Sequence, residues 1–254
     1  MDRPKVFLYV SASLDGRITF APNSTMFDAF KQPELFAMMS YPGEWEGFTQ
    51  AVFELYKPDM YLEGSNMLIS EIQTPPELPP FTGNPKTLYK DFLPEDILNR
   101  PGRNTWTSVV DGRGRFRNGY TADCDDPHTY MLHLTAETAP PEYLAFLKSR
   151  KIPYLIQGKG RVDLPRMLVK VKNKLGVHTI VTSSGGKLSG ALIRQGLLDE
   201  INILFSPLVI GGYSIPTLFS SPEPHWPDIL PNKLQLLDMK TLYQDKIWLR
   251  YKVL

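Results

Sequence analysis

The second half of the chain alternates short apolar runs with amphipathic stretches, and this alternation limits the possible folds most strongly. Five of the runs carry the β-branched and aromatic residues that are typical of strands. They are residues 106–110, 130–135, 152–157, 177–182 and 200–210. Helical spacing of apolar positions separates them, at residues 141–150, 164–175 and 188–195. Strands that alternate with helices predict an α/β fold with a largely parallel sheet.

The ends of the chain add strands to this pattern. Residues 6–10 form a continuous apolar run that ends at a turn signal, and such a run predicts a strand buried on both faces. Residues 233–238 and 246–253 resemble an antiparallel pair. A helix is expected to end before Pro58, and a further helical piece is expected at residues 67–72.

Proline is concentrated in one segment. Of the 23 prolines, seven fall within residues 75–101, where regular helix or central strand is excluded. Residues 73–103 therefore predict a long irregular loop, which either wraps the surface or covers a site. Because the chain has 254 residues, we expect a single domain over residues 1–254 that includes this loop.

Composition excludes several classes of function. Lys and Arg total 28 against 27 for Asp and Glu, so no basic surface indicates a nucleic acid or anionic membrane partner. The single cysteine, Cys124, excludes an intramolecular disulfide and any metal site built on two thiolates. No apolar run is long enough to cross a bilayer or to act as a secretory signal. We therefore expect a cytoplasmic protein with no metal site.

A loop rich in glycine follows the predicted strand at residues 177–182. Its sequence is Ser183-Ser184-Gly185-Gly186-Lys187, and a helix comes next. Two glycines allow close approach of a ligand to the backbone, and a helix N-terminus favours anions. The pattern fits a phosphate or pyrophosphate site, and it equally fits an ordinary strand-to-helix turn. It does not match the Walker motif, because Val181 and Leu188 occupy positions where that motif has glycine and a hydroxyl residue.

A turn with three arginines closes the strand at residues 106–110. Arg113, Arg115 and Arg117 alternate with glycine and phenylalanine. Guanidinium groups match phosphate oxygens, so the turn is either a site for a phosphate, which could be a ribose 2′-phosphate or a phosphate of the substrate, or a solvated basic hairpin.

Other candidates are weaker. Residues 123–128 combine acids, Cys124 and His128, but Pro127 and adjacent acids are more typical of a polar loop than of a metal site. His133 lies in an apolar run and is expected to be a hydrogen-bonded structural histidine. No Gly-x-Ser-x-Gly elbow is present, so nothing indicates a serine nucleophile.

Three blocks together resemble one family. They are Val-Ser-Ala-Ser-Leu-Asp-Gly-Arg-Ile at residues 10–18, Val-Val-Asp-Gly-Arg-Gly-Arg-Phe at 109–116, and the glycine loop with its helix, which continues to residue 212. In this order they resemble the reductase domain of bacterial bifunctional riboflavin deaminase-reductases and its stand-alone relatives. The resemblance implies a dihydrofolate-reductase-like fold, a three-layer α/β/α sandwich around a mixed, mostly parallel sheet. The chain lacks the two cysteines of the deaminase zinc signature.

The resemblance also implies a function. It indicates a homodimer that uses NADPH to reduce the ribosyl group of a pyrimidine ribosylamine phosphate to a ribityl group. Substrate would be bound by Asp15 and Ser183, and Glu71 would be the catalytic acid. The residues it assigns to the cofactor are Ala12, Asn66, Met67, Gly112, Arg113, Ser184, Gly185, Gly186, Lys187 and Leu188.

The chain departs from the family pattern at positions near the substrate. Ser183 stands where the family has glutamate, Met67 where it has threonine, and Glu71 within a segment that replaces Ala-Asp-Asp-Pro. These departures leave two alternatives open. The chain could reduce another small heterocycle such as a pterin, or it could be a catalytically degenerate dimer that binds a nucleotide.

Overall fold

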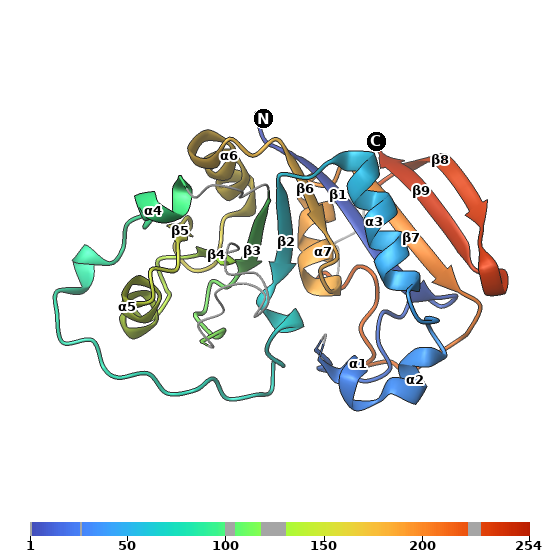
Figure 1. Ribbon diagram of the computed structural model, residues 1–254, viewed down its shortest axis with the longest axis horizontal. Coiled ribbons are helices and arrows are strands. Elements are labelled where there is room, and N and C mark those ends of the chain that lie inside the picture. Colours follow the sequence, from blue (N-terminus) through green and yellow to red (C-terminus); the bar gives the residue numbers. More distant parts are fainter. Residues whose placement is uncertain (1, 26, 100–104, 118–130, 223–229) are drawn as a thin grey trace. The chain divides into compact units, whose positions relative to one another are not determined.

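The computed structural model describes residues 2–25, 27–99, 105–117, 131–222 and 230–254 (Figure 1). The chain divides into two compact units. Unit 1 comprises Met1–Pro4 and Asp59–His178, and unit 2 comprises Lys5–Pro58 and Thr179–Leu254. Each unit contains its own set of strands and is described by itself.

Unit 1 has four parallel strands in the order β5-β4-β3-β2. All four are short and largely buried, as expected for parallel strands with covered faces. They are β2 (Met60–Gly64), β3 (Trp106–Val110), β4 (Met131–Thr135) and β5 (Tyr154–Ile156). The helices α5 (Pro141–Ser149) and α6 (Leu164–Leu175) follow β4 and β5 and bury one face each.

The proline-rich segment belongs to unit 1 and closes the free edge of β5. Phe92 and Tyr154 exchange two backbone hydrogen bonds of 2.9 Å each, which add a one-residue antiparallel bridge to that edge. The hydroxyl of Tyr154 also donates to the carbonyl of Leu88 at 2.9 Å. Leu88 is buried with Tyr143 and Leu144 of α5 in one apolar cluster. The segment is irregular over most of its described length, but the prediction that it contains no regular helix is wrong, since it includes the short helix α4 (Glu95–Leu98) besides η2 (Pro85–Thr87).

Unit 2 has five strands in the order β6-β1-β7-β9-β8. β1 pairs in parallel with β6 on one side and with β7 on the other. β9 pairs antiparallel with both of its neighbours, β7 and β8. The strands are β1 (Lys5–Ser13), β6 (Thr179–Thr182), β7 (Glu200–Ser206), β8 (Leu234–Thr241) and β9 (Ile247–Val253). The helices are α1 (Asp28–Lys31), α2 (Pro33–Ala37), α3 (Glu44–Tyr56) and α7 (Gly186–Arg194), with the 3₁₀ turn η3 (Tyr243–Asp245) between β8 and β9.

The structure confirms the predicted α/β class with mostly parallel strands, and it corrects two predicted boundaries and one predicted helix. β7 ends at Ser206 and does not reach residue 210, because Pro207 has no N–H to donate. The helix predicted at residues 67–72 is absent, and the 3₁₀ turn η1 (Ser65–Met67) is followed by irregular chain. The helix after the glycine loop begins two residues early, at Gly186. Gly196 ends it in the left-handed region, with φ of +64°, as its sequence position predicts.

Candidate functional site

The glycine loop connects β6 to α7 in unit 2 and leaves the start of α7 without a side-chain cap. Gly185 is the N-cap residue, in an extended conformation, and has no side chain to accept from the first turn. In α6, by contrast, the carboxylate of Asp163 accepts the backbone N–H of Arg166 at 3.1 Å. An uncapped helix N-terminus offers polarised N–H groups to an anion.

The serines of this loop face the protein interior. Ser184 is 1% exposed, and its hydroxyl lies 3.1 Å from that of Ser189 on α7. The Ser189 hydroxyl donates in turn to the carbonyl of Ser184 at 2.8 Å. Ser183 is buried as well. The backbone of Ser184 is engaged as well, since its N–H donates to the Thr182 hydroxyl at 3.2 Å, and the assignment of Ser184 to the cofactor stays a prediction.

The protein's own backbone fills the space that a side chain at Gly186 would occupy, so a ligand cannot enter on that side, and the assignment of Gly186 to the cofactor stays a prediction. A Cβ at Gly186 would lie 2.0 Å from the carbonyl oxygen of Thr217, and one at Gly190 would lie 2.8 Å from that of Ser220. The N–H of Ser220 donates to the carbonyl of Gly186 at 2.9 Å. Because neither glycine has a side chain, residues 217–221 can pack directly against the backbone of α7.

Three further predicted residues of unit 2 lie on β1 and α7. Ala12 is fully buried near the end of β1 and is paired with Phe205 of β7. Lys187 is exposed in the first turn of α7, and Leu188 beside it is half-buried. Their assignment to the cofactor stays a prediction.

Asp15 anchors a loop of unit 2. Its carboxylate accepts the Ser13 hydroxyl at 2.6 Å and the backbone N–H groups of Ile210 and Gly211 at 3.0 and 2.8 Å. These hydrogen bonds, that from Ser13 foremost, hold the pKa of Asp15 well below its usual value. The carboxylate thus fixes the loop after β7, and its predicted contact with substrate stays a prediction.

In unit 1, the three arginines of the turn after β3 have different roles. Arg115 is buried and donates to the carbonyls of Ser70, Glu71 and Gln73 at 2.7, 3.1 and 3.0 Å. Desolvation, with a smaller effect of Arg113, lowers the pKa of its guanidinium. Arg117 donates to the carbonyls of Gly114 and Pro76. The side chain of Arg113 is 59% exposed, and Arg113 is the most exposed of the three arginines.

The remaining predicted residues of unit 1 lie around these arginines. The amide oxygen of Asn66 is 3.4 Å from Nη1 of Arg115, and Met67 follows it in η1. The carboxylate of Glu71 lies 3.9 Å from Nη2 of Arg113, with 35% of its side chain exposed. These contacts bring Asn66, Glu71 and Arg113 together through the buried Arg115.

A fully buried chain of hydrogen bonds stabilises the turn after β3 from the interior of unit 1. The hydroxyl of Tyr143 donates to Asp111 Oδ2 at 3.2 Å and lies 2.6 Å from Nδ1 of His133. The same carboxylate oxygen accepts the backbone N–H of Phe116 at 2.7 Å. Burial lowers the pKa of His133 to about 4 and raises that of Tyr143 well above its usual value. The prediction that His133 is a hydrogen-bonded structural histidine is confirmed.

A second loop touches this turn, and the sequence analysis missed it. A Cβ at Gly112 would lie 3.3 Å from Cγ2 of Val162, and the hydroxyl of Thr138 donates to the carbonyls of Gly112 and Gly160 at 3.5 and 3.3 Å. Gly158 has φ of +104°, which the turn of residues 157–163 requires. Gly158 and Gly160 could have indicated a turn at this point of the sequence, but they do not indicate that it contacts Gly112.

Two further findings concern metal ions and membranes. Within the described ranges, no three His, Cys, Asp or Glu side chains are grouped so as to hold a metal ion. The candidate at residues 123–128 lies outside those ranges. None of the described helices combines the length and the apolar character that crossing a bilayer requires.

Comparison with known proteins identifies the family. The model of the RibD C-terminal domain matches residues 4–247. A 2,5-diamino-6-ribosylamino-4(3H)-pyrimidinone 5′-phosphate reductase of Archaeoglobus fulgidus is 26% identical over 218 residues, 85% of this chain and 86% of that protein. The reductase of the same name from Methanothermobacter thermautotrophicus is 30% identical over 118 residues, and the match spans 46% of this chain and about half, 53%, of the relative.

Solved structures support the fold. This chain aligns over 99% of its length with the structure of a pyrimidine reductase-like protein from Corynebacterium diphtheriae. The alignment covers 92% of that protein, with a TM-score of 0.65 and 15% sequence identity. At this identity the likeness concerns the fold alone, and it agrees with the α/β class of both units. With the three sequence blocks and the family match over residues 4–247, the chain belongs to the RibD C-terminal domain family.

Proposed function

We propose that this chain is an NADPH-dependent reductase that converts the ribosyl group of a pyrimidine ribosylamine phosphate to a ribityl group. The observation that carries the proposal is the uncapped N-terminus of α7, which follows directly on the glycine loop in a member of this family. The names of the relatives from Archaeoglobus and Methanothermobacter support the reaction.

The residues present fit a phosphorylated nicotinamide nucleotide. In unit 2, the first turn of α7 offers backbone donors and the positive end of the helix dipole. In unit 1, the guanidinium of Arg113 is exposed and matches a phosphate such as the one that distinguishes NADPH from NADH. We propose Gly185, Gly186, Lys187 and Leu188 for the pyrophosphate, and Gly112 and Arg113 for the 2′-phosphate.

The chemistry divides between cofactor and protein. Opening of the ribosyl ring breaks the bond between C1′ and the ring oxygen and gives an imine, and the nicotinamide, when bound, would supply the hydride that reduces the carbon of this imine. The nitrogen of that imine must gain a proton, and we propose that the carboxyl group of Glu71 provides it. Arg113 lies 3.9 Å from that carboxylate, and the 2′-phosphate proposed for Arg113 is at the opposite end of the cofactor from the nicotinamide, so only one of these two assignments can hold. Asp15 and Ser183 are proposed for substrate binding.

A second candidate function keeps the cofactor and changes the substrate. Ser183 replaces a family glutamate and removes a carboxylate next to the glycine loop. A pterin or another small heterocycle would then be the acceptor. The third reading, a degenerate dimer that binds a nucleotide without turnover, remains the alternative to both enzymes.

The test is oxidation of NADPH with defined acceptors. We expect turnover with the pyrimidine ribosylamine phosphate and none with a pterin. Turnover with the pterin alone would favour the second candidate, and binding of NADPH without turnover would favour the degenerate dimer. Binding itself is read from the free energy of unfolding, which should increase by about 2.7 kcal/mol at a hundredfold excess over the dissociation constant.

The glycine loop is tested best by Gly185→Asp. Gly185 has φ of −61° and ψ of 164°, a conformation that any residue adopts, and aspartate is a preferred N-cap. The new carboxylate should cap α7 and occupy the donors that we assign to the pyrophosphate. We expect loss of NADPH binding with unchanged or increased stability. Gly185→Ser is the matched control, since it adds a cap without the charge and should bind better than Gly185→Asp.

We propose in addition that the protein is a homodimer, as the family resemblance implies. Sedimentation equilibrium of the full chain measures this directly. A mass of twice 28.9 kDa is expected, and a monomer at micromolar concentration would contradict the proposal.

A further inference from the structure

The carboxylate of Asp111 lies inside unit 1, at the base of the turn that carries Arg113. Asp111 is 1% exposed. Its Oδ2 accepts the N–H of Phe116 at 2.7 Å and the hydroxyl of Tyr143 at 3.2 Å, and its Oδ1 has no hydrogen-bond partner among the described residues. A charged group this deeply buried depends strongly on each of its hydrogen bonds. The two bonds to Oδ2 therefore decide where the turn of residues 111–116 can lie.

The direction of the hydrogen bonds around Tyr143 follows from the groups involved. The Tyr143 hydroxyl has one hydrogen and a carboxylate has none to give, so Tyr143 donates to Asp111. The hydroxyl oxygen then accepts, and Nδ1 of His133, 2.6 Å away, carries the proton. Burial raises the pKa of Tyr143 well above its usual value and lowers that of His133 to about 4. Tyr143 therefore stays a donor, and His133 stays neutral, between about pH 5 and 9.

The ring of Tyr143 supports the same turn sterically. Gly114 has φ of +61°, a conformation that favours glycine, and a Cβ there would lie 2.7 Å from Cδ1 of Tyr143. The backbone of the turn thus rests directly on the tyrosine ring. On β4, the hydroxyl of Thr135 donates to the carbonyl of Asp111 at 2.9 Å. Asp111 and Gly114, which flank residues 112–113, are therefore both held from the interior.

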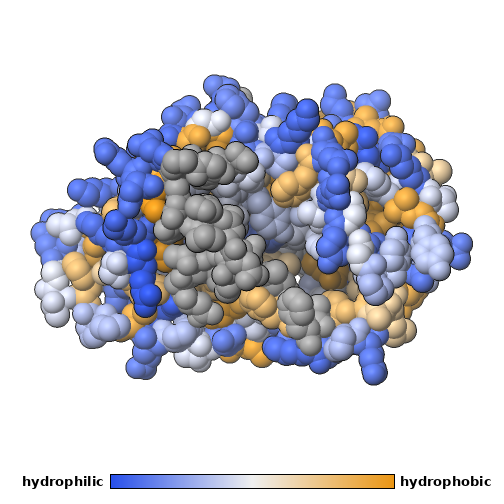
Figure 2. Space-filling model, viewed as in Figure 1, coloured by the Kyte–Doolittle hydropathy of each residue, from blue (hydrophilic) through white to orange (hydrophobic). Residues whose placement is uncertain are grey.

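The helix α5 directs Tyr143 inward, although the end of this helix reaches the surface. Tyr143 is 0% exposed, whereas Lys148 and Ser149 of the same helix are exposed. Figure 2 shows hydrophilic side chains at the left of the view, where Figure 1 places α5. Phenylalanine would fill the same volume as Tyr143. What the hydroxyl adds at this position is its pair of hydrogen bonds, to Asp111 and to His133.

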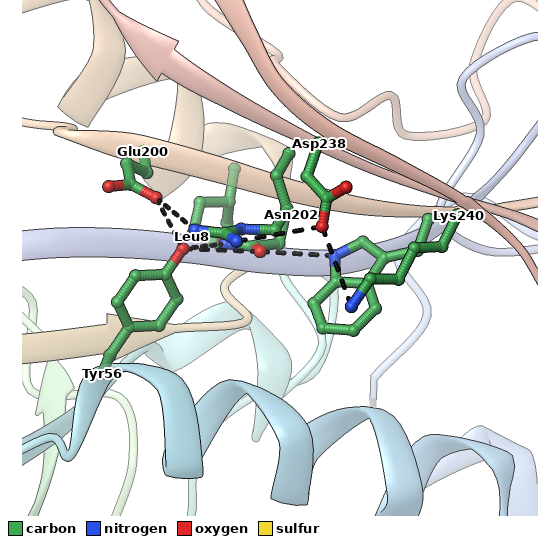
Figure 3. A network of polar contacts seen from close by, with 8 residues as sticks. Leu8, Tyr56, Glu200, Asn202, Asp238 and Lys240 are labelled. Carbon is green, nitrogen blue, oxygen red and sulfur yellow. Dashed lines mark hydrogen bonds and ion pairs between the residues drawn. The ribbon is translucent and has the colours of Figure 1, made fainter.

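A second tyrosine network, in unit 2, has the same order of groups and no connection to a predicted site. The amide of Asn202 donates to the Tyr56 hydroxyl at 3.0 Å, and that hydroxyl donates to the carboxylate of Glu200 at 2.8 Å (Figure 3). None of the residues labelled in Figure 3 is among those that we assign to cofactor or substrate. This network is therefore a matched comparison for the one around Asp111.

We infer that Tyr143 is a positioning residue for phosphate recognition, because it holds the turn in the arrangement that directs the Arg113 guanidinium to the 2′-phosphate. Tyr143 is too deeply buried to touch a ligand and acts through Asp111 and Gly114. Without its hydroxyl, the buried carboxylate would lose one of its two hydrogen bonds, and the turn would shift until Asp111 regains a partner. The inference rests on the proposed function, through the assignment of Arg113 to the 2′-phosphate of NADPH.

The experiment compares three substitutions of tyrosine by phenylalanine in the full chain. Tyr143→Phe removes the hydroxyl behind the turn and keeps the ring. Tyr56→Phe removes the equivalent donor to Glu200 in unit 2. Tyr154→Phe removes a hydroxyl that donates to the carbonyl of Leu88 at 2.9 Å, within the same apolar cluster as Tyr143. Urea unfolding checks that each variant folds.

Isothermal titration calorimetry measures the dissociation constants of NADPH and NADH for each variant. We expect Tyr143→Phe to raise the dissociation constant for NADPH by about 10-fold and to leave that for NADH unchanged, because only NADPH presents a phosphate to Arg113. Tyr56→Phe and Tyr154→Phe should keep both constants at their wild-type values. Thr135→Val removes the other support of the turn and should weaken NADPH binding in the same way, so the test holds even if Tyr143→Phe does not fold.

A double substitution separates positioning from a general loss of stability. In Arg113→Ala no guanidinium is left to position, so adding Tyr143→Phe should not raise the dissociation constant for NADPH further. Three results would overturn the inference: wild-type affinity for NADPH in Tyr143→Phe, equal weakening of NADH, or effects of the two substitutions that multiply.

Failure of the inference and failure of the proposed function give different results. If the inference alone fails, the wild type still binds NADPH and Arg113→Ala still weakens that binding. Unchanged binding in Arg113→Ala would remove the 2′-phosphate assignment, and the inference with it. A wild type that binds neither nucleotide would remove the proposed function as well.

Discussion

His133 should make the stability of this protein depend on pH in a window where few other groups titrate. The imidazole is fully buried, and desolvation lowers its pKa from the ordinary 6.5 to about 4. The unfolded chain therefore binds a proton at pH values where the folded chain does not. Stability is complete above pH 6.5 and is lost as the pH falls toward 4.

The two pKa values set the magnitude. Each pKa unit between the states corresponds to about 1.4 kcal/mol, and integration from pH 7 to pH 4.5 gives a loss of about 2 kcal/mol from this one residue. The carboxyl groups with lowered pKa, such as Asp28 and Asp91, titrate below 3.8 in the folded chain. These carboxyl groups therefore contribute little to the change in the free energy of unfolding above pH 4.5. His133 therefore dominates the change in this window.

Urea unfolding at pH 7 and pH 4.5 measures the effect. In His133→Asn, an amide can still donate to the Tyr143 hydroxyl but does not gain a proton in this pH range. The free energy of unfolding of this variant should therefore decrease between pH 7 and pH 4.5 by about 2 kcal/mol less than that of the wild type. His178→Asn, at an exposed position, is the matched control and should keep the wild-type difference. If wild type and His133→Asn lose the same stability, the buried histidine is not the source and the reasoning is wrong.

Four more predictions concern single substitutions. Arg113→Ala should raise the KM for NADPH by about 10- to 100-fold and leave that for NADH unchanged, because only NADPH has the phosphate assigned to this guanidinium. Gly186→Ala should destabilise by about 1–3 kcal/mol in urea unfolding, since its methyl group would meet the backbone of Thr217. Gly47→Ala, at a helical glycine where an added methyl group would have no atom within 4 Å, should instead stabilise by up to about 1 kcal/mol. Asp15→Ala should free the loop at Ile210, which limited proteolysis would detect as faster cleavage there; an unchanged cleavage pattern would argue against the anchor.

The sequence predicted those features that depend on neighbouring residues. The alternation of apolar and amphipathic runs gave the strands and helices, and proline and glycine marked where they stop. The burial of His133 followed from its place inside an apolar run. Each of these depends on local periodicity or backbone freedom, which a single sequence contains.

Contacts between distant segments could not be predicted. Gly186 was read as room for a ligand, yet residues 217–221 occupy that room, and nothing in either segment names the other. Arg113 and Arg115 are two residues apart in one turn, and only the fold decides that Arg115 points inward to Ser70 while Arg113 faces solvent. The same holds for the apolar residues of β8 and β9, because an apolar residue on a strand does not tell whether the chain covers it.

The position of β1 has a consequence for how the protein is made. This strand is synthesised before both of its partners, β6 and β7, and its pairing with β6 begins with Lys5 opposite Thr179. Translation at about 5–20 residues per second separates these segments by roughly 10–35 seconds. For that time an apolar strand is exposed without its neighbours, which makes the nascent chain of unit 2 a natural client for chaperones that hold extended apolar segments.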